Sequence, residues 1–126
     1  MGADRRLDWL RQAENDLQSA RHMRAGGFHA QACFTAQQAG EKALKALCFA
    51  RGFDIVRTHS LFQLVSDLGE NGAVERCAKE LDLFYISGRY PDAFPGGAPF
   101  ELIGADQSER ALAAAQTVLE FVTERL

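Results

Sequence analysis

The sequence predicts an all-α protein, a five-helix up-and-down bundle of four long helices and one short one. Apolar residues recur at spacings of three and four along most of the chain, as they do on one face of an α-helix. No stretch alternates apolar and polar residues as a half-buried strand would. All three prolines fall within residues 89–104, which therefore predict a long Pro/Gly-rich loop before the last helix.

Length and composition indicate one globular domain over residues 1–126. Hydrophobic residues make up 47% of the chain and charged residues 25%, which is enough for one hydrophobic core. The net charge of −3 provides no general attraction to nucleic acid. No apolar run approaches the roughly 20 residues of a membrane helix, and the N-terminus lacks a signal-peptide core. We therefore expect no membrane contact. Because the three cysteines contain no C-x-x-C pair, we expect buried free thiols in a reducing cytoplasm.

The first helix is expected from Asp4, as its N-cap, to about Arg24. Its predicted apolar face consists of Leu7, Leu10, Ala13, Leu17 and Ala20. Trp9 lies off that face, and we expect it at an edge or a subunit contact. Gly26 and Gly27 then end the helix, and a turn of two glycines between long helices predicts an antiparallel hairpin.

Residues 28–52 predict the central helix of the bundle. A stripe of small side chains, which lets neighbouring helices approach closely, is formed by Ala32, Ala36, Ala39, Ala43, Ala46 and Ala50. Larger apolar residues outside that stripe predict partners on more than one side: Phe34, Leu44, Leu47 and Phe49. We expect Glu41, Lys42 and Lys45 on the wetter face, with an ion pair between Glu41 and Lys45. Gly52 is the expected left-handed cap.

Three further helices follow. A short one, carrying Leu61, is capped by Thr58 or Ser60. A fourth helix is predicted over residues 73–87, and Gly88 ends it. Its expected inward residues are Val74, Cys77, Leu81, Phe84 and Tyr85. The last helix is predicted from Asp106, which begins an Asp-x-x-Glu capping box, to the C-terminus.

Three segments together resemble a known family. They are AQQAGEKALKAL in the central helix, HSL at residues 59–61 and LDLFYISGRYPDAF at residues 81–94. In this order they resemble the prokaryotic branch of the HEPN family (higher eukaryotes and prokaryotes nucleotide-binding domain), from about Trp9 into the last helix. The resemblance implies a five-helix bundle that dimerises and that often works beside a minimal nucleotidyltransferase in a toxin–antitoxin pair. It also implies that many relatives are metal-independent endoribonucleases.

The ribonuclease signature of that family is an Arg followed four to six residues later by a His. Arg89 stands at the Arg position, but Phe94 stands five residues on, so the R-x4-H signature is incomplete. A His can transfer the proton of a ribose hydroxyl, and an Arg can stabilise the charge of the transition state. A second match, from Arg24 to His29, lies in the first interhelical turn, and we interpret it as coincidence, with His29 an exposed residue at a helix start.

The remaining candidate residues are grouped around Arg89. His59 is either an ordinary helix-start residue or part of a pocket with Arg89. Arg89 and Asp92 form either an ion pair that holds the loop or a contact for phosphate. The candidate ligand-binding residues are Arg89, Tyr90, Asp92, Lys42, Lys45 and Tyr85, and the candidate catalytic residues are Arg89 and His59. The tyrosines can stack a base or anchor the fold, and the lysines are either solvated or beside the groove.

Three functions follow from these observations. The first is a dimeric binding module for a nucleotide, RNA or a minimal nucleotidyltransferase, with a degenerate ribonuclease signature. The second is a metal-independent endoribonuclease toxin that uses Arg89, alone or with His59. The third is a purely structural partner subunit. No metal site is predicted, because no two His or Cys residues have ligand spacing, and no cofactor is implied.

Overall fold

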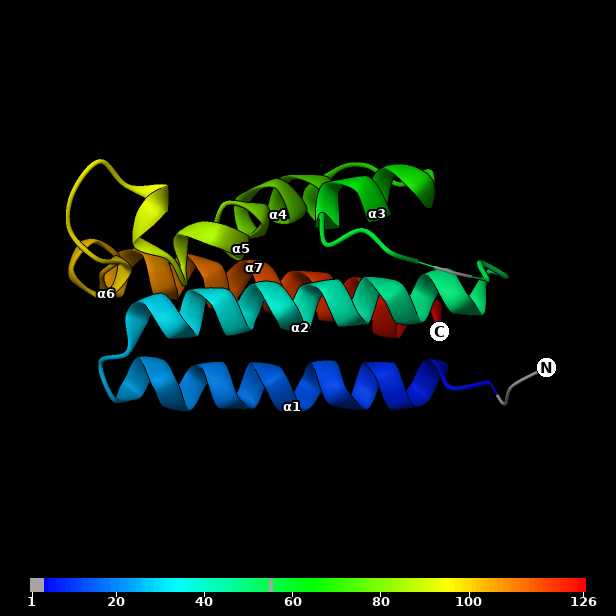
Figure 1. The fold of residues 1–126 in the computed structure, drawn as a ribbon. Coiled ribbons are helices and arrows are strands. Elements are labelled where there is room, and N and C mark those ends of the chain that lie inside the picture. The colour runs from blue at the N-terminus through cyan, green and yellow to red at the C-terminus, as the bar shows by residue number, and fades with distance from the viewer. Residues whose placement is uncertain (1–3, 55) are drawn as a thin grey trace.

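A computed structural model describes residues 4–54 and 56–126, and within those ranges it contains helices and no strand. The helices are α1 (Arg6–Ala25), α2 (His29–Ala50), α3 (Leu61–Asp67), α4 (Ala73–Asp82), α5 (Phe84–Ser87), the 3₁₀ turn η1 (Pro91–Ala93), α6 (Pro99–Leu102) and α7 (Ala105–Arg125). Figure 1 shows α2 in the middle, with α1 on one side and the row of α3, α4 and α5 on the other. The long C-terminal helix α7 packs against α1, α2 and α4. The predicted all-α bundle is confirmed.

The hairpin of α1 and α2 forms as predicted, and Gly27 takes a positive φ of 85° in its turn. The predicted apolar face of α1 is buried except at Leu7, which is 61% exposed, so that part of the prediction is wrong. Trp9 instead covers this end of the hairpin, and its ring lies 5.6 Å from the ring of Phe49 on α2. The N-cap residue of α1 is Arg5 and not the predicted Asp4, although the carboxylate of Asp4 accepts a hydrogen bond from the amide of Arg6.

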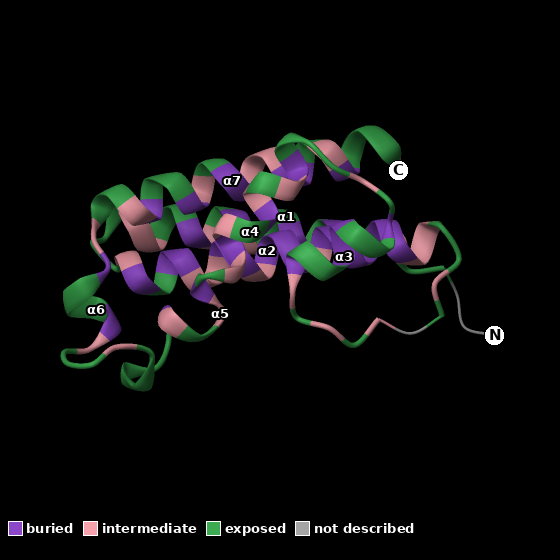
Figure 2. Cartoon of the chain, turned by 90° about the horizontal axis from the view of Figure 1, so that it is seen from above, coloured by how far each residue is buried: buried purple, intermediate pink, exposed green. Residues whose placement is uncertain are grey.

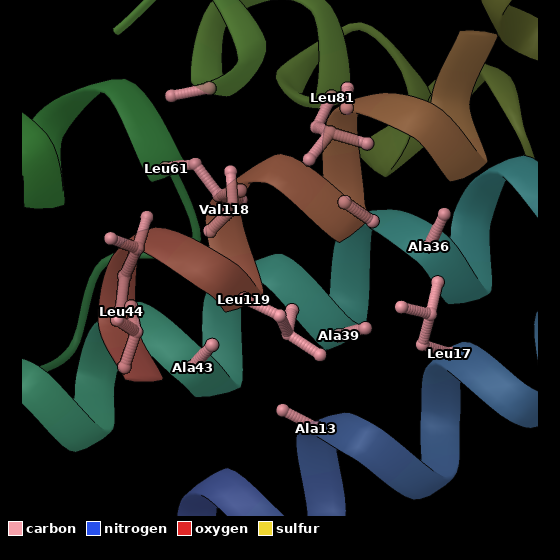
Figure 3. Packing of buried hydrophobic residues seen from close by; sticks show 14 of the residues in the cluster. Ala13, Leu17, Ala36, Ala39, Ala43, Leu44, Leu61, Leu81, Val118 and Leu119 are labelled. Carbon is pink, nitrogen blue, oxygen red and sulfur yellow. The ribbon is translucent and has the colours of Figure 1, made fainter. Parts of the chain in front are cut away.

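The alanine stripe of α2 is buried in the core, with only Ala50 partly exposed. Figure 3 shows alanines of α2 lying between side chains of α1 and α7, while Leu61 and Leu81 come from the other side. The purple buried residues of α2 in Figure 2 accordingly lie among helices on several sides. A Cβ at Gly40 would lie 2.6 Å from Leu61 Cδ2, so this glycine lets α3 approach α2 closely. Partners on more than one side of α2 are therefore confirmed.

The prediction that Glu41 and Lys45 lie on a solvent-exposed face of α2 is wrong. Glu41 is only 5% exposed and Lys45 only 6%. His59, just before α3, contacts Glu41, with 3.1 Å between Nδ1 and Oε2, and Gln37 of α2 donates to the carbonyl of His59 at 3.1 Å. The predicted ion pair is present, with 2.8 Å between Lys45 Nζ and Glu41 Oε2. Helix α2 ends as predicted, with Gly52 at a φ of 93°.

The predicted helix over residues 73–87 is interrupted at Leu83, between α4 and α5. Asp82, the last residue of α4, caps the start of α3 from a distance in sequence. Its carboxylate accepts hydrogen bonds from Ser60 Oγ at 2.8 Å, Leu61 N at 2.7 Å and Phe62 N at 3.0 Å. Of the two predicted caps, Thr58 and Ser60, Ser60 is the N-cap residue of α3. Its hydroxyl oxygen accepts a hydrogen bond from the amide of Gln63.

The last helix begins at Ala105, one residue before the predicted Asp106 cap. The side chain of Gln107 accepts from the amide of Gly104 at 3.0 Å, so Gly104 and Gln107 replace the predicted Asp106–Glu109 box. The predicted loop over residues 89–104 also contains η1 and α6, because a proline stands at the start of each short turn, where its missing N–H costs nothing.

The cysteines are free, as expected. Cys33 and Cys48 are buried, and Cys77 is half-buried. Burial raises the pKa of Cys33 to about 12 and that of Cys48 to about 11, which disfavours the reactive thiolate. None of the described helices combines the length and the apolar character that a membrane span requires.

The Asp82 cap yields the first prediction. Replacing Asp82 by Ala removes the acceptor for two backbone amides of α3 and should lower the free energy of unfolding by about 1–2 kcal/mol. Asp82→Asn keeps one carbonyl acceptor and should lose less. Urea unfolding of both variants measures the difference. Equal stability of Asp82→Ala and the unmodified protein would show that water replaces the carboxylate at no cost.

Candidate functional site

The candidate site is built around Arg89, which directly follows the α5 C-cap residue Gly88. Its guanidinium carbon lies over three aromatic rings, at 4.3 Å from the centroid of Phe34 and 4.7 Å from those of Tyr85 and Tyr90. Its Nε donates to the carbonyl of Tyr85 at 3.0 Å. Within the described ranges, no carboxylate forms an ion pair with this exposed side chain. The terminal nitrogens of the guanidinium are therefore available to an anion.

His59 belongs to the same cluster through Tyr85. The two rings stack, with centroids 4.9 Å apart and an interplanar angle of 14°. His59 and Arg89 therefore contact the same ring, that of Tyr85, and the pocket that would join them stays a prediction. The side chain of His59 is 54% exposed, and its Nδ1 lies 3.1 Å from Glu41 Oε2.

A buried polar network fixes Glu41 beneath His59. Its Oε2 receives Lys45 Nζ as well as His59 Nδ1, and its Oε1 accepts from Gln37 Nε2 at 3.3 Å. Each polar atom of these buried side chains has a hydrogen-bond partner. Because buried charges are stable only when they are paired, Glu41 and Lys45 depend on each other.

An open groove of about 470 Å³ lies beside Arg89. It is lined from the first hairpin by Met23, Ala30, Gln31, Phe34 and Thr35, and from the segment after α5 by Gly88, Arg89, Pro91, Ala98, Pro99 and Phe100. Most of these side chains are apolar, and Arg89 is the single charged group among them. The groove therefore suits a ligand with a flat apolar part and an anionic group.

Two predicted candidates lie away from this cluster. Lys42 points toward α1, where its Nζ lies 2.5 Å from the carboxylate of Asp16, so the structure does not favour the alternative that places it beside Arg89. Asp92 is exposed in η1, and the described residues show no ion pair between it and Arg89. The alternative in which Asp92 and Arg89 hold the loop together is therefore wrong. Lys45 is near the cluster, but it is buried behind Glu41.

Phe94, at the position where the family carries its His, is half-buried and packs against the hydrophobic core. A phenyl ring cannot transfer a proton. Phe34 is the site residue that the sequence did not reveal, because its apolar character at a helical spacing indicated packing alone. The sequence gives one indirect signal for the role of Phe34. Tyr85 and Arg89 are four residues apart, a spacing that places a cation next to an aromatic ring.

The second R-x4-H match is a structural contact. Arg24 Nε lies 3.0 Å and His29 Nδ1 2.9 Å from Oγ of the buried Ser108, whose hydroxyl donates to the carbonyl of Ala105. His29 is half-buried, so its expected exposure is wrong. The cluster joins α1, α2 and α7 at one end of the bundle, and every group in it has a partner.

Two larger grooves lie elsewhere. One of about 630 Å³ is lined by Trp9, Lys42 and residues of the first turns of α1, and one of about 570 Å³ lies between α1 and α7. In the first, Arg5 and Arg11 both pair with Asp8. Paired cations attract an anion less than the unpaired Arg89 does. The larger volume of the groove on α1 therefore does not make it the better candidate for an anion-binding site.

Comparisons with known proteins agree with this fold. The HEPN domain model matches residues 7–126. The structure of TT1696 from Thermus thermophilus is 42% identical with a TM-score of 0.93, over 98% of this chain and 100% of that one. The structure of ST0689, an archaeal HEPN homologue, is 34% identical with a TM-score of 0.84, and the match covers 99% of this chain and 98% of that one. The structure of an HEPN domain protein from Thermotoga maritima is 28% identical with a TM-score of 0.73, and the match covers 93% of this chain and 95% of that one. A comparison with curated proteins gave no match.

Proposed function

The chain belongs to the HEPN domain family, and we propose that it is a binding module whose Arg89 holds the phosphate of a nucleotide or of RNA. The observation that carries this proposal is the guanidinium of Arg89, which rests on three aromatic rings without a carboxylate partner among the described residues. A guanidinium held in this way binds phosphate with two parallel hydrogen bonds and loses little conformational entropy.

Aromatic rings beside a phosphate-binding cation support a nucleotide in particular. Tyr90 is 48% exposed, so part of its ring surface is open to a base. Stacking of a base on an aromatic ring contributes about 1–3 kcal/mol and tolerates any base. The adjacent groove adds the apolar surfaces of Pro99 and Phe100. A ligand that combines a flat base with a phosphate fits these neighbours.

We also propose a homodimer and a minimal nucleotidyltransferase partner in a toxin–antitoxin pair. Both come from the family, and both need exposed apolar surface. Large exposed apolar side chains occur on and around α5 and α6, at Leu83, Ile86, Tyr90, Phe100 and Leu102. Patches of this kind mark interaction surfaces. Light scattering at micromolar concentration tests the dimer, and a monomer there contradicts it.

The second prediction tests Arg89. Arg89→Ala should weaken binding of a short fluorescent RNA about tenfold to a hundredfold, because hydrogen bonds to a charged group contribute about 1.5–3 kcal/mol. Arg89→Lys should recover part of the affinity, since it keeps the charge without the planar fork. Fluorescence anisotropy at fixed salt measures both.

Arg11→Ala is the matched control for Arg89→Ala, because it removes an exposed Arg that lines the larger groove on α1. Its RNA affinity should stay close to that of the unmodified protein. A loss in Arg11→Ala with no loss in Arg89→Ala would move the site to α1 and overturn the proposal.

A metal-independent endoribonuclease is the second candidate function. It is favoured by the contact of His59 and Arg89 with one Tyr85 ring, which brings a proton-transfer group near a cation. Incubation with RNA in EDTA tests it. Absence of cleavage at any protein concentration removes this candidate. Cleavage that persists in both Arg89→Ala and His59→Ala would show that these residues are not its active site.

A further inference from the structure

We propose that His59 is a specificity-determining residue that selects ribose over deoxyribose, with Glu41 as its positioning residue. His59 would accept a hydrogen bond from the 2′-hydroxyl of the nucleotide whose phosphate Arg89 binds. This inference rests on the proposed function of Arg89 and names the class of ligand, a ribonucleotide. It requires that one particular ring nitrogen of His59 be a free acceptor.

The contact with Glu41 decides which nitrogen that is. An ionised carboxylate only accepts hydrogen bonds, so Nδ1 of His59, 3.1 Å from Glu41 Oε2, must carry a proton. The ring of a neutral histidine carries one proton, and the other nitrogen is then an acceptor. In the neutral form of the ring, Nε2 of His59 is therefore the acceptor. Glu41 holds this arrangement because Lys45 and Gln37 fix both of its oxygens.

The surroundings of His59 leave Nε2 open. No described residue is hydrogen-bonded to Nε2, and the side chain is 54% exposed. The stacked ring of Tyr85 restricts rotation of the imidazole. The guanidinium carbon of Arg89 lies 4.7 Å from the centroid of that same Tyr85 ring, so the donor fork and the acceptor nitrogen both belong to side chains that contact Tyr85.

A ribonucleotide matches this pair of groups. Its phosphate oxygens accept from Arg89, and its 2′-hydroxyl, a donor as well as an acceptor, can donate to Nε2. A deoxyribonucleotide offers the phosphate alone, and the 2′-hydroxyl is the group by which proteins distinguish RNA from DNA at a given site. The charged group in contact with His59 is Glu41, which also pairs with Lys45; Arg89 contacts the Tyr85 ring on which His59 stacks, and Asp82 caps the residues that follow His59.

The third prediction compares oligoadenylates of equal length as RNA, DNA and 2′-O-methyl RNA. The unmodified protein should bind RNA roughly tenfold more tightly than either of the others, the effect of one hydrogen bond. His59→Asn places an amide donor where Nδ1 lies and removes Nε2. In His59→Asn, RNA affinity should fall to the DNA level while DNA affinity stays unchanged. Equal binding of RNA and DNA by the unmodified protein, or an RNA preference that persists in His59→Asn, overturns the inference.

Nitrogen NMR of the unliganded protein separates this inference from the proposed function. The neutral ring of His59 should show a protonated Nδ1 and a bare Nε2, and Glu41→Gln should shift that tautomer balance. A proton on Nε2 in the unmodified protein overturns the role of Glu41, whatever binds. Failure of every oligonucleotide to bind, or binding unchanged by Arg89→Ala, instead overturns the proposed function.

Discussion

Glu41→Ala is expected to lower the free energy of unfolding by about 3–5 kcal/mol, because it leaves the buried ammonium of Lys45 without a charge partner. The same substitution removes the acceptor that holds Gln37 Nε2 and His59 Nδ1. Urea denaturation followed by far-ultraviolet circular dichroism measures the change. Lys42→Ala is the control on the same helix, and it should lose about 1 kcal/mol or less, because Lys42 is partly solvated beside Asp16.

The double substitution Glu41→Leu with Lys45→Met separates charge from packing. Replacing a buried ion pair by apolar residues of similar volume is often neutral or stabilising. The double variant should therefore recover most of the stability that Glu41→Ala loses. A loss below about 1 kcal/mol in Glu41→Ala, or a double variant as unstable as the single one, would contradict the buried pair as the cause.

The same pair of variants distinguishes stability from function. The double variant keeps the fold but provides no acceptor for Nδ1 of His59. We therefore expect a stable protein that binds RNA and DNA alike. These results would assign the interaction between Glu41 and His59 to the proposed site and that between Glu41 and Lys45 to the fold.

The helical elements could be predicted because their signals are local. The spacing of alanines in α2 and the glycines that end helices act over one or two turns. The same local pattern cannot show which other element covers a face. Lys42 and Lys45 are three residues apart, yet Lys42 pairs with Asp16 of α1, whereas Lys45 is buried and pairs with Glu41.

Contacts between distant residues explain the remaining errors. Asp82 caps a helix whose first residue lies 21 positions earlier, so no capping pattern in the sequence reveals it. His29 and Ser108 are 79 residues apart, and only the packing of α2 beside α7 joins them. Arg89, Tyr85 and His59 were found through the family resemblance, because physical reasoning from the sequence leaves their distances open.

Gly88→Ala is expected to lower stability by about 1–3 kcal/mol and to weaken RNA binding together with it. Gly88 has a φ of −77°, so an alanine can adopt its backbone conformation, and the cost comes from space alone. An added Cβ would lie 2.9 Å from the carbonyl oxygen of Phe84, 3.0 Å from Phe34 Cβ and 3.2 Å from the carbonyl oxygen of Ala30. The Phe84 carbonyl belongs to α5 itself, so that contact strains the end of α5. Phe34 Cβ and the Ala30 carbonyl belong to α2 and cannot rotate away as a side-chain tip can, so α5 must also move away from α2.

That movement would separate Arg89 from the ring of Phe34, 4.3 Å away on α2, while the guanidinium itself stays intact. Gly96→Ala is the matched control, because a Cβ there meets no atom within 4 Å, and it should change neither stability nor affinity. Thermal unfolding and RNA anisotropy on both variants give the result. If Gly88→Ala loses stability but keeps full affinity, the contact between Arg89 and Phe34 is not needed for binding. If it loses neither, α5 can shift along α2 at no cost, and the close approach at Gly88 does not position the site.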